Sequence, residues 1–216
     1  MSHVIDRLGL SGSVWAYAVE LLPLLAVTAA VYLIVSILRN KLRGVRVRPL
    51  RKLATLAFVC YCAGVAGLVL VPLNFWYSME AWILGGVWPP SWVRILGTGA
   101  FNFVPTFVKV LTGQFTTGAW VRAMGMLNIL LFVPMGLLPP LLWKRLASWR
   151  GLALGVGVSL AVELLQPLIG RDFDVDDLMA NAIGTAVGLC VCLLLGRVLP
   201  GFVALFRKQP QPDSAP

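Results

Sequence analysis

The sequence predicts an all-α membrane protein, a polytopic bundle of about five transmembrane helices with an additional interfacial or re-entrant segment. Of the 216 residues, 59% are apolar and only 12% are charged, and the mean hydropathy is +0.85. An ordinary soluble domain carries about a quarter charged residues, so that class is excluded. We expect one membrane domain over residues 1–200 and a disordered cytoplasmic tail over residues 201–216, which ends in the polar stretch QPQPDSAP.

The first two predicted spans flank a basic loop. Residues 15–38 are almost wholly apolar and exceed the ~20 residues that a helix needs to cross a bilayer, and residues 53–73 predict the second span. Seven of the 18 basic residues lie between them, within residues 39–52. Lys and Arg favour cytoplasmic loops, which places the N-terminus outside and predicts an uncleaved first helix. The net charge of +9 is thus explained by basic residues that orient the protein in the membrane and can contact anionic lipids. We expect no nucleic-acid partner.

The connection over residues 74–121 is unusual for a loop because it is rich in aromatic residues, Gly and Pro but has few charges. Trp and Tyr favour the headgroup level of a bilayer, so this connection is expected to lie along the outer interface. A short re-entrant piece is the alternative, which is tolerated only where other protein covers its backbone.

The second half predicts three further spans. Basic residues recur within residues 144–150 and in the tail, so both segments are expected in the cytoplasm, like residues 39–52. The acidic loop over residues 169–176 then lies outside. The three spans cover residues 122–143, 151–168 and 177–199.

The fourth predicted span carries polar residues near its outer end. Glu163 and Gln166 lie one turn apart on the same helix face, and Ser159 lies one turn below Glu163. A carboxylate at this depth needs a partner, and Arg171 is available a few residues on. The alternative is that Glu163 is a structural tie between helices.

The fifth predicted span begins with two acidic residues, Asp176 and Asp177. One of them is expected to cap the helix, because a carboxylate accepts hydrogen bonds from free N–H groups at a helix start. The other is left for Arg171, a ligand or a metal. An EF-hand is excluded, because the Gly and Glu that it needs are replaced by Asp177 and Ile183; a looser divalent-cation site stays open.

Polar and small residues continue down the same helix. Asn181 lies one turn below Asp177, and Gly184 and Gly188 extend the stripe, where close helix packing is expected. Gly151 and Gly155 offer the same device on the fourth span, and Asn128 of the third span could meet Glu163 or Asn181. We expect a polar pocket beneath the outer surface, and the residues predicted to line it are Asn102, Asn128, Glu163, Gln166, Arg171, Asp174, Asp177 and Asn181.

Other site chemistries find no support in the sequence. The four cysteines lie in apolar segments without metal or redox spacing, and His3 is the only histidine. A Ser–His protease and a multi-histidine metal site are therefore disfavoured, and no nucleotide-binding loop is present. We expect neither a cofactor nor a metal.

Three ordered motifs carry a resemblance to a known family. They are NFVP from Asn102, NILLFVPMGLLPP from Asn128, and VELLQ with GRDFDVDDLMANAIGTAVG from Val162 to Gly188. The chain resembles the VanZ-like family of bacterial membrane proteins over residues 70–195. The resemblance implies a multi-pass protein of the bacterial plasma membrane and carries the family's motif positions onto the predicted pocket. The family name comes from an accessory protein linked to reduced susceptibility to teicoplanin.

Two function classes remain in competition. In the first, the pocket binds an envelope lipid, a lipid-linked precursor or a glycopeptide-like ligand, with Arg171 pairing an anionic group. In the second, the protein is an intramembrane enzyme acting on an envelope lipid, with Glu163 as general base and Asp174 or Asp177 holding a metal or a cationic group. A transporter is disfavoured, because the first two spans offer no polar path and no inverted repeat is evident.

Overall fold

The computed structural model describes residues 14–43, 48–69, 99–114 and 118–207, together with positions 85 and 116. Within these residues, five helices are long and apolar enough to cross a membrane. This confirms the predicted all-α polytopic bundle. The five helices are α2 (Val14–Arg43), α3 (Pro49–Val69), α6 (Ala119–Leu142), α7 (Trp149–Leu165) and α8 (Val175–Val198).

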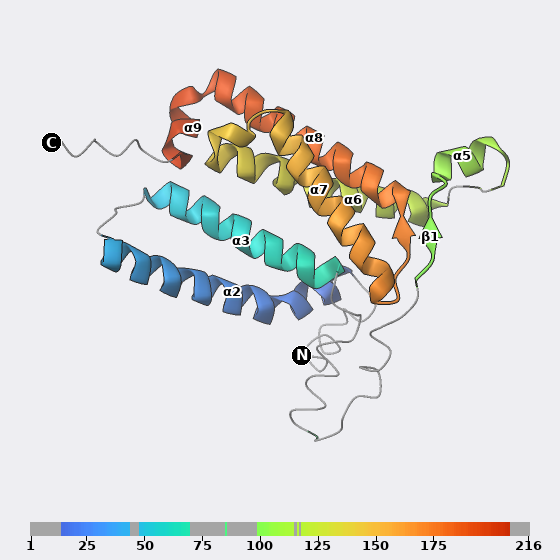
Figure 1. Cartoon of the computed structure of the whole chain (residues 1–216), viewed down its shortest axis with the longest axis horizontal. Coiled ribbons are helices and arrows are strands. Elements are labelled where there is room, and N and C mark those ends of the chain that lie inside the picture. Colours follow the sequence, from blue (N-terminus) through green and yellow to red (C-terminus); the bar gives the residue numbers. More distant parts are fainter. Residues whose placement is uncertain are drawn as a thin grey trace.

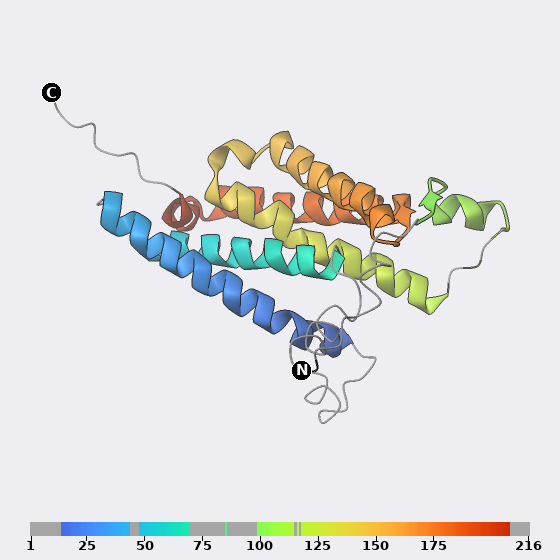
Figure 2. The same ribbon diagram turned by 60° about the horizontal axis from the view of Figure 1, so that its bottom comes forward.

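The five helices lie side by side along the long axis of the molecule (Figure 1). The helix α2 packs on α3, α3 packs on α6, and both α6 and α7 pack on α8. In the second view α2 lies at the outer edge of the bundle, and α6 lies among α3, α7 and α8 (Figure 2). The most intimate pairing is that of α6 with α8, and it determines where the polar residues of both helices meet.

Glycines explain why α6 and α8 approach so closely. A Cβ atom added to Gly184 or Gly188 of α8 would collide with the carbonyl oxygens of Ile129 and Val133 on α6, and one added to Gly136 would collide with the carbonyl oxygen of Thr185. Small residues of this kind let backbones pack together within a bilayer. The close packing predicted for the Gly184–Gly188 stripe is confirmed.

The predicted glycine pair on α7 divides between two roles. A Cβ atom at Gly155 would overlap the side chain of Thr185, so Gly155 does permit the α7–α8 contact. A Cβ atom at Gly151 would instead overlap the carbonyl oxygen of Leu146 in the turn before α7. The added atom would also lie 3.2 Å from the side chain of Pro140 on α6, so Gly151 is required chiefly by the α6–α7 turn.

The three segments predicted to be cytoplasmic meet at one end of the bundle. Arg51 donates from Nη1 to the carbonyl oxygens of Leu142 (2.9 Å) and Phe206 (2.8 Å), and Arg48 donates to that of Ala204 (3.0 Å). These bonds join the start of α3 to the end of α6 and to a short helix, α9 (Pro200–Phe206). The single-turn helix η2 (Lys144–Leu146) lies at the same end, between α6 and α7.

The helix α9 corrects the prediction of a disordered tail from residue 201. Residues 200–206 read PGFVALF, and Val203 is only 1% exposed in a small core with Leu141 and Cys192. This apolar stretch has hydrophobic surface to bury, whereas only the polar end of the tail, QPQPDSAP, has a composition that favours disorder. Residues 208–216 lie outside the described part of the chain.

A two-stranded parallel sheet, which the sequence did not predict, forms at the other end of the bundle. Strand β1 (Phe101–Asn102) pairs with β2 (Phe173–Asp174), with Phe101 opposite Phe173 and Asn102 opposite Asp174. The short helix α5 (Thr106–Leu111) follows β1 and projects beyond the end of the bundle (Figure 1). Of the segment over residues 74–121 that was predicted to be interfacial or re-entrant, residues 74–84, 86–98, 115 and 117 lie outside the described part.

Candidate functional site: a polar cluster beside the β1–β2 pair

Polar side chains from three helices gather at the end of the bundle that carries the two strands. The helix α7 starts at the basic end and finishes here, where η3 (Gln166–Leu168) leads through a loop to β2 and the start of α8. We call the following residues the polar cluster: Asn128, Ser159, Glu163, Gln166, Asp174, Asp177 and Asn181.

Glu163 is the deepest charged residue of the cluster, with only 1% of its surface exposed. Its Oε2 atom accepts a hydrogen bond from the backbone N–H of Asp174 at 3.2 Å. This bond joins the last turn of α7 to the residue before α8. The hydrogen-bond donor to Glu163 is thus a backbone N–H and not Arg171, which had been expected as its partner.

The capping residue of α8 is Asp174 and not Asp176 or Asp177, which corrects the prediction. Asp174 has extended backbone angles, and its Oδ1 atom accepts from the N–H of Asp176 at 2.9 Å. The helix therefore begins earlier than predicted, at Val175. Both Asp176 and Asp177 are left free to bind other segments.

The remaining loop carboxylates hold the β1–α5 segment. Both oxygens of Asp176 accept from the N–H of Thr106, the first residue of α5, at 3.0 and 2.9 Å. Oδ1 of Asp172 accepts from the N–H of Ala100 at 2.7 Å. Within the described residues, no group of three or more His, Cys, Asp or Glu side chains is arranged to hold a metal ion. The carboxylates of Asp172 and Asp176 thus engage backbone N–H donors.

Two side-chain pairs connect α8 to its neighbours. Asn128 of α6 donates from Nδ2 to Oδ1 of Asp177. One turn deeper, Asn181 donates from Nδ2 to Oγ of Ser159 on α7 at 2.9 Å, and Thr185 donates to the carbonyl oxygen of Asn181. Asn128 was predicted to meet Glu163 or Asn181, and the structure pairs it with Asp177 instead.

Arg171 and Asn102 lie at the rim of the cluster and not in its interior. Arg171 is exposed and donates from Nη1 to the carbonyl oxygens of Leu68 (3.0 Å) and Val69 (3.1 Å), where α3 ends. It remains close enough to interact electrostatically with Glu163 and Asp177. Oδ1 of Asn102 accepts from Nζ of Lys109 at 2.8 Å.

Two buried amide oxygens of the cluster have no hydrogen-bond donor among the described residues. They are Oε1 of Gln166 and Oδ1 of Asn181, and these side chains are 5% and 4% exposed. Buried polar atoms are nearly always paired in folded proteins, with protein or with ordered water, because an unpaired one costs ~1–3 kcal/mol. The cluster can therefore accept further hydrogen bonds from a bound group.

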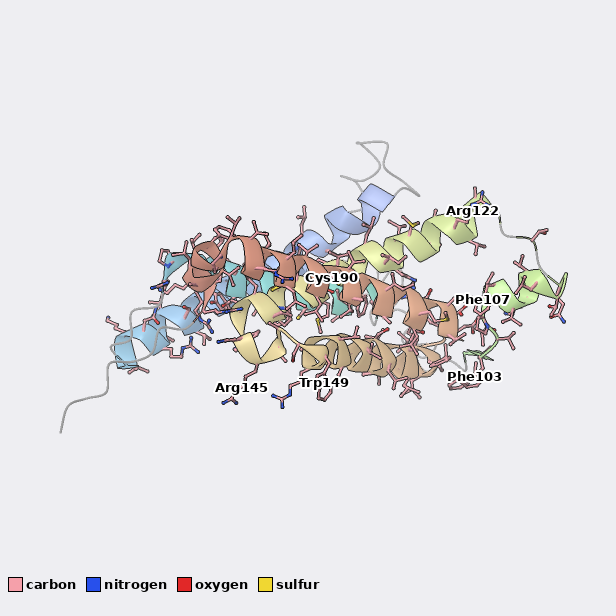
Figure 3. All side chains as sticks on the ribbon, turned by 90° about the horizontal axis from the view of Figure 1, so that it is seen from above. Phe103, Phe107, Arg122, Arg145, Trp149 and Cys190 are labelled. Carbon is pink, nitrogen blue, oxygen red and sulfur yellow. The ribbon has the colours of Figure 1, made fainter. Side chains whose placement is uncertain are left out.

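The sequence indicated that the connection before α6 is rich in aromatic residues, but not how its rings pack against Phe173. The rings of Phe101, Phe103 and Phe173 lie against one another with centroids 5.2 to 5.8 Å apart. Phe103 is 65% exposed, and Phe107 of α5 is also exposed. Both lie beyond the end of α7 that is opposite to Trp149 (Figure 3). Phe101 and Phe173 lie on β1 and β2, which were not predicted because a two-residue strand is too short to show the alternation of apolar and polar residues by which a strand is recognised.

Comparison with known proteins assigns the chain to a family. A family model described as VanZ/LLP1 matches residues 58–196, a stretch that contains both strands, α6, α7 and every residue of the polar cluster. No curated protein and no solved structure matches the chain. The match covers more than half of the sequence and confirms the resemblance seen in the motifs. The chain therefore belongs to the VanZ/LLP1 family of membrane proteins.

Proposed function

We propose that the polar cluster binds the headgroup of an envelope lipid or of a lipid-linked precursor from the outer side of the bacterial plasma membrane. The observation that carries this proposal is the burial of Glu163 beside Gln166 and Asn181, whose side-chain oxygens lack donors within the described chain. Burying ionisable and polar groups at this depth is costly, and in membrane proteins such groups commonly mark a binding site.

The neighbouring segment suits the apolar part of such a ligand. Phe103 and Phe107 are exposed next to the cluster, on a segment that Asp176 and the β1–β2 pairing hold in place. Acyl chains can pack on these rings while a headgroup enters the cluster. Arg171 and Lys109 at the rim supply positive charge for a phosphate group.

The direct test is native mass spectrometry of the full-length protein released from detergent, after mixing with an extract of bacterial envelope lipids. We expect bound lipid in the wild type and a several-fold loss in Arg171→Ala. Arg145→Ala, at an exposed position of the basic end, is the matched control and should retain the lipid. A wild-type protein that carries no lipid, or equal loss in both variants, would refute the proposal.

Intramembrane catalysis is the second candidate, and one feature of Glu163 favours it. Its carboxylate accepts a single backbone hydrogen bond within the described chain, which leaves acceptor capacity for a proton. If Glu163 is a general base, the wild type should convert a labelled envelope lipid and Glu163→Gln should bind the lipid without converting it. The binding proposal expects no turnover by either protein.

The same site is proposed to act on glycopeptides that carry an acyl chain, as teicoplanin does. Expression of the protein in a susceptible bacterium should then reduce susceptibility to teicoplanin but not to a glycopeptide without an acyl chain. Gln166→Met should abolish the difference. An unchanged teicoplanin susceptibility would separate lipid binding from resistance.

A further inference from the structure

We infer that the buried part of the polar cluster takes a primary ammonium group, so that the preferred ligand is an aminophospholipid. This inference rests on the proposed function and specifies the chemistry of the headgroup. It follows from the signs of the groups in the interior and at the rim.

The interior presents acceptors. Glu163 and Asp177 are carboxylates that interact electrostatically with each other, and Glu163 is almost fully buried. The unpartnered atoms of Gln166 and Asn181 are oxygens. The amide nitrogens of Asn128 and Asn181 are already donating, to Asp177 and Ser159. A group that enters here has to bring hydrogen-bond donors, and a positive charge is favoured over a negative one.

The sign of the interior does not depend on how the two amides are oriented. Turning the amide of Asn181 or Gln166 would present an N–H donor in place of the unpartnered oxygen. The carboxylates of Glu163 and Asp177 would remain acceptors, and their charge favours a cationic group.

The rim carries two cations. Arg171 is exposed where α3 ends, and Lys109 of α5 bonds to Asn102 on β1. The carboxylates of Asp172 and Asp176 at the same end accept hydrogen bonds from backbone N–H groups. An aminophospholipid headgroup has a phosphate next to a primary ammonium, which matches these two cations beside an acidic interior. A quaternary ammonium has no N–H group to donate, and an anionic headgroup would place negative charge near Glu163.

The test is a competition measured by native mass spectrometry on the full chain in detergent. Phosphatidylethanolamine, phosphatidylcholine and phosphatidylglycerol with identical acyl chains are supplied at equal concentration. We expect phosphatidylethanolamine to be retained at least about tenfold over each of the others, because hydrogen bonds to charged groups are strong. Equal retention of phosphatidylcholine or phosphatidylglycerol overturns the inference while leaving lipid binding intact, whereas retention of no lipid overturns both.

A matched pair of variants tests whether the preference for phosphatidylethanolamine depends on Gln166. Gln166→Met removes the buried oxygen at nearly constant volume and should reduce the preference for phosphatidylethanolamine several-fold. Gln114→Met makes the same change at an exposed position after α5 and should leave it unchanged. If both variants keep the full preference, the amine is not held at Gln166 and the inference fails.

A change on the ligand needs no variant and so avoids any folding defect. N-acetylated phosphatidylethanolamine has lost the ammonium charge and should be retained no better than phosphatidylcholine; retention equal to that of the unmodified lipid contradicts the inference. Water-soluble phosphoethanolamine separates the two sources of this chemistry. Displacement of the bound lipid shows that the headgroup suffices. Lack of displacement, where the preference for phosphatidylethanolamine over phosphatidylcholine is present, shows that the amine is recognised on the intact lipid.

Discussion

Glycine positions determine how closely α6 and α8 pack. Replacing Gly188 by Leu would drive a side chain into the backbone of α6 at Val133. We expect Gly188→Leu to lower the free energy of unfolding by about 3 kcal/mol or more, because overpacking against backbone cannot relax by a rotamer change. Thermal unfolding in detergent measures the effect. Gly196→Leu lies on the same helix where a Cβ meets nothing within 4 Å, and an equal loss there would contradict the explanation.

A substitution at Glu163 tests whether this residue ties two helices together or binds a ligand. Glu163→Gln keeps an oxygen for the N–H of Asp174 but removes the negative charge. We expect this variant to unfold within a few degrees of the wild type while losing most of its bound lipid. Asp172→Asn makes the same change at an exposed position and should lose neither property. A collapse of thermal stability in Glu163→Gln would instead favour the structural tie between α7 and α8.

The separate residues of the site show what could be predicted at this scale. Asn128, Glu163, Asp177 and Asn181 were all expected to lie together, and each has a partner in the cluster or its immediate backbone. The pairing itself was not predictable. Asn128 meets Asp177 because the glycine contacts fix the rotation of α8 against α6, and that rotation is a property of the packed helices.

At the level of elements, the β1–α5 segment depends on one carboxylate of α8. Asp176→Ala removes both hydrogen bonds to Thr106 and leaves the start of α5 without a side-chain partner. A hydrogen bond to a charged group contributes ~1.5–3 kcal/mol, so amides of residues 99–114 should exchange about ten- to a hundredfold faster. Hydrogen exchange with mass spectrometry measures this.

The control for that experiment is Asp176→Asn, which retains an acceptor oxygen and should exchange at an intermediate rate. Peptides from α6 and α7 should be unaffected in both variants. If exchange rises equally in those peptides, Asp176 stabilises the whole bundle and not the segment that carries Phe103 and Phe107.

Elements of different length were predictable to different degrees. The five long helices follow from apolar runs of about 20 residues and were all expected. The strands β1 and β2, with two residues each, carry no periodicity and exist because the loops before α5 and α8 run alongside one another. The helix α9 was missed because its seven residues, PGFVALF, were grouped with the polar tail.

For the whole molecule, the two ends of the bundle differ in chemistry. Arg48 and Arg51 hold α9 and the end of α6 at the basic end, and the polar cluster lies at the other. The positive-inside rule predicts that the basic end faces the cytoplasm. In a background in which the four native cysteines are replaced, Asp172→Cys should react with an impermeant maleimide in intact cells. Arg150→Cys should react only after permeabilisation, and the reverse pattern would place the cluster inside and exclude an outward-facing site.

The sequence by itself determined the membrane class, the helices that cross, the grouping of basic segments at one end and the approximate membership of the polar cluster. These follow from composition, the length of apolar runs and the spacing of side chains along single helices, which are local properties. Tertiary structure decided which partners the polar atoms find. Asp174 caps α8, Asp176 holds α5, and Arg171 binds the end of α3. Such choices depend on which backbone N–H and carbonyl groups remain free once the helices have packed, and no single segment contains that information.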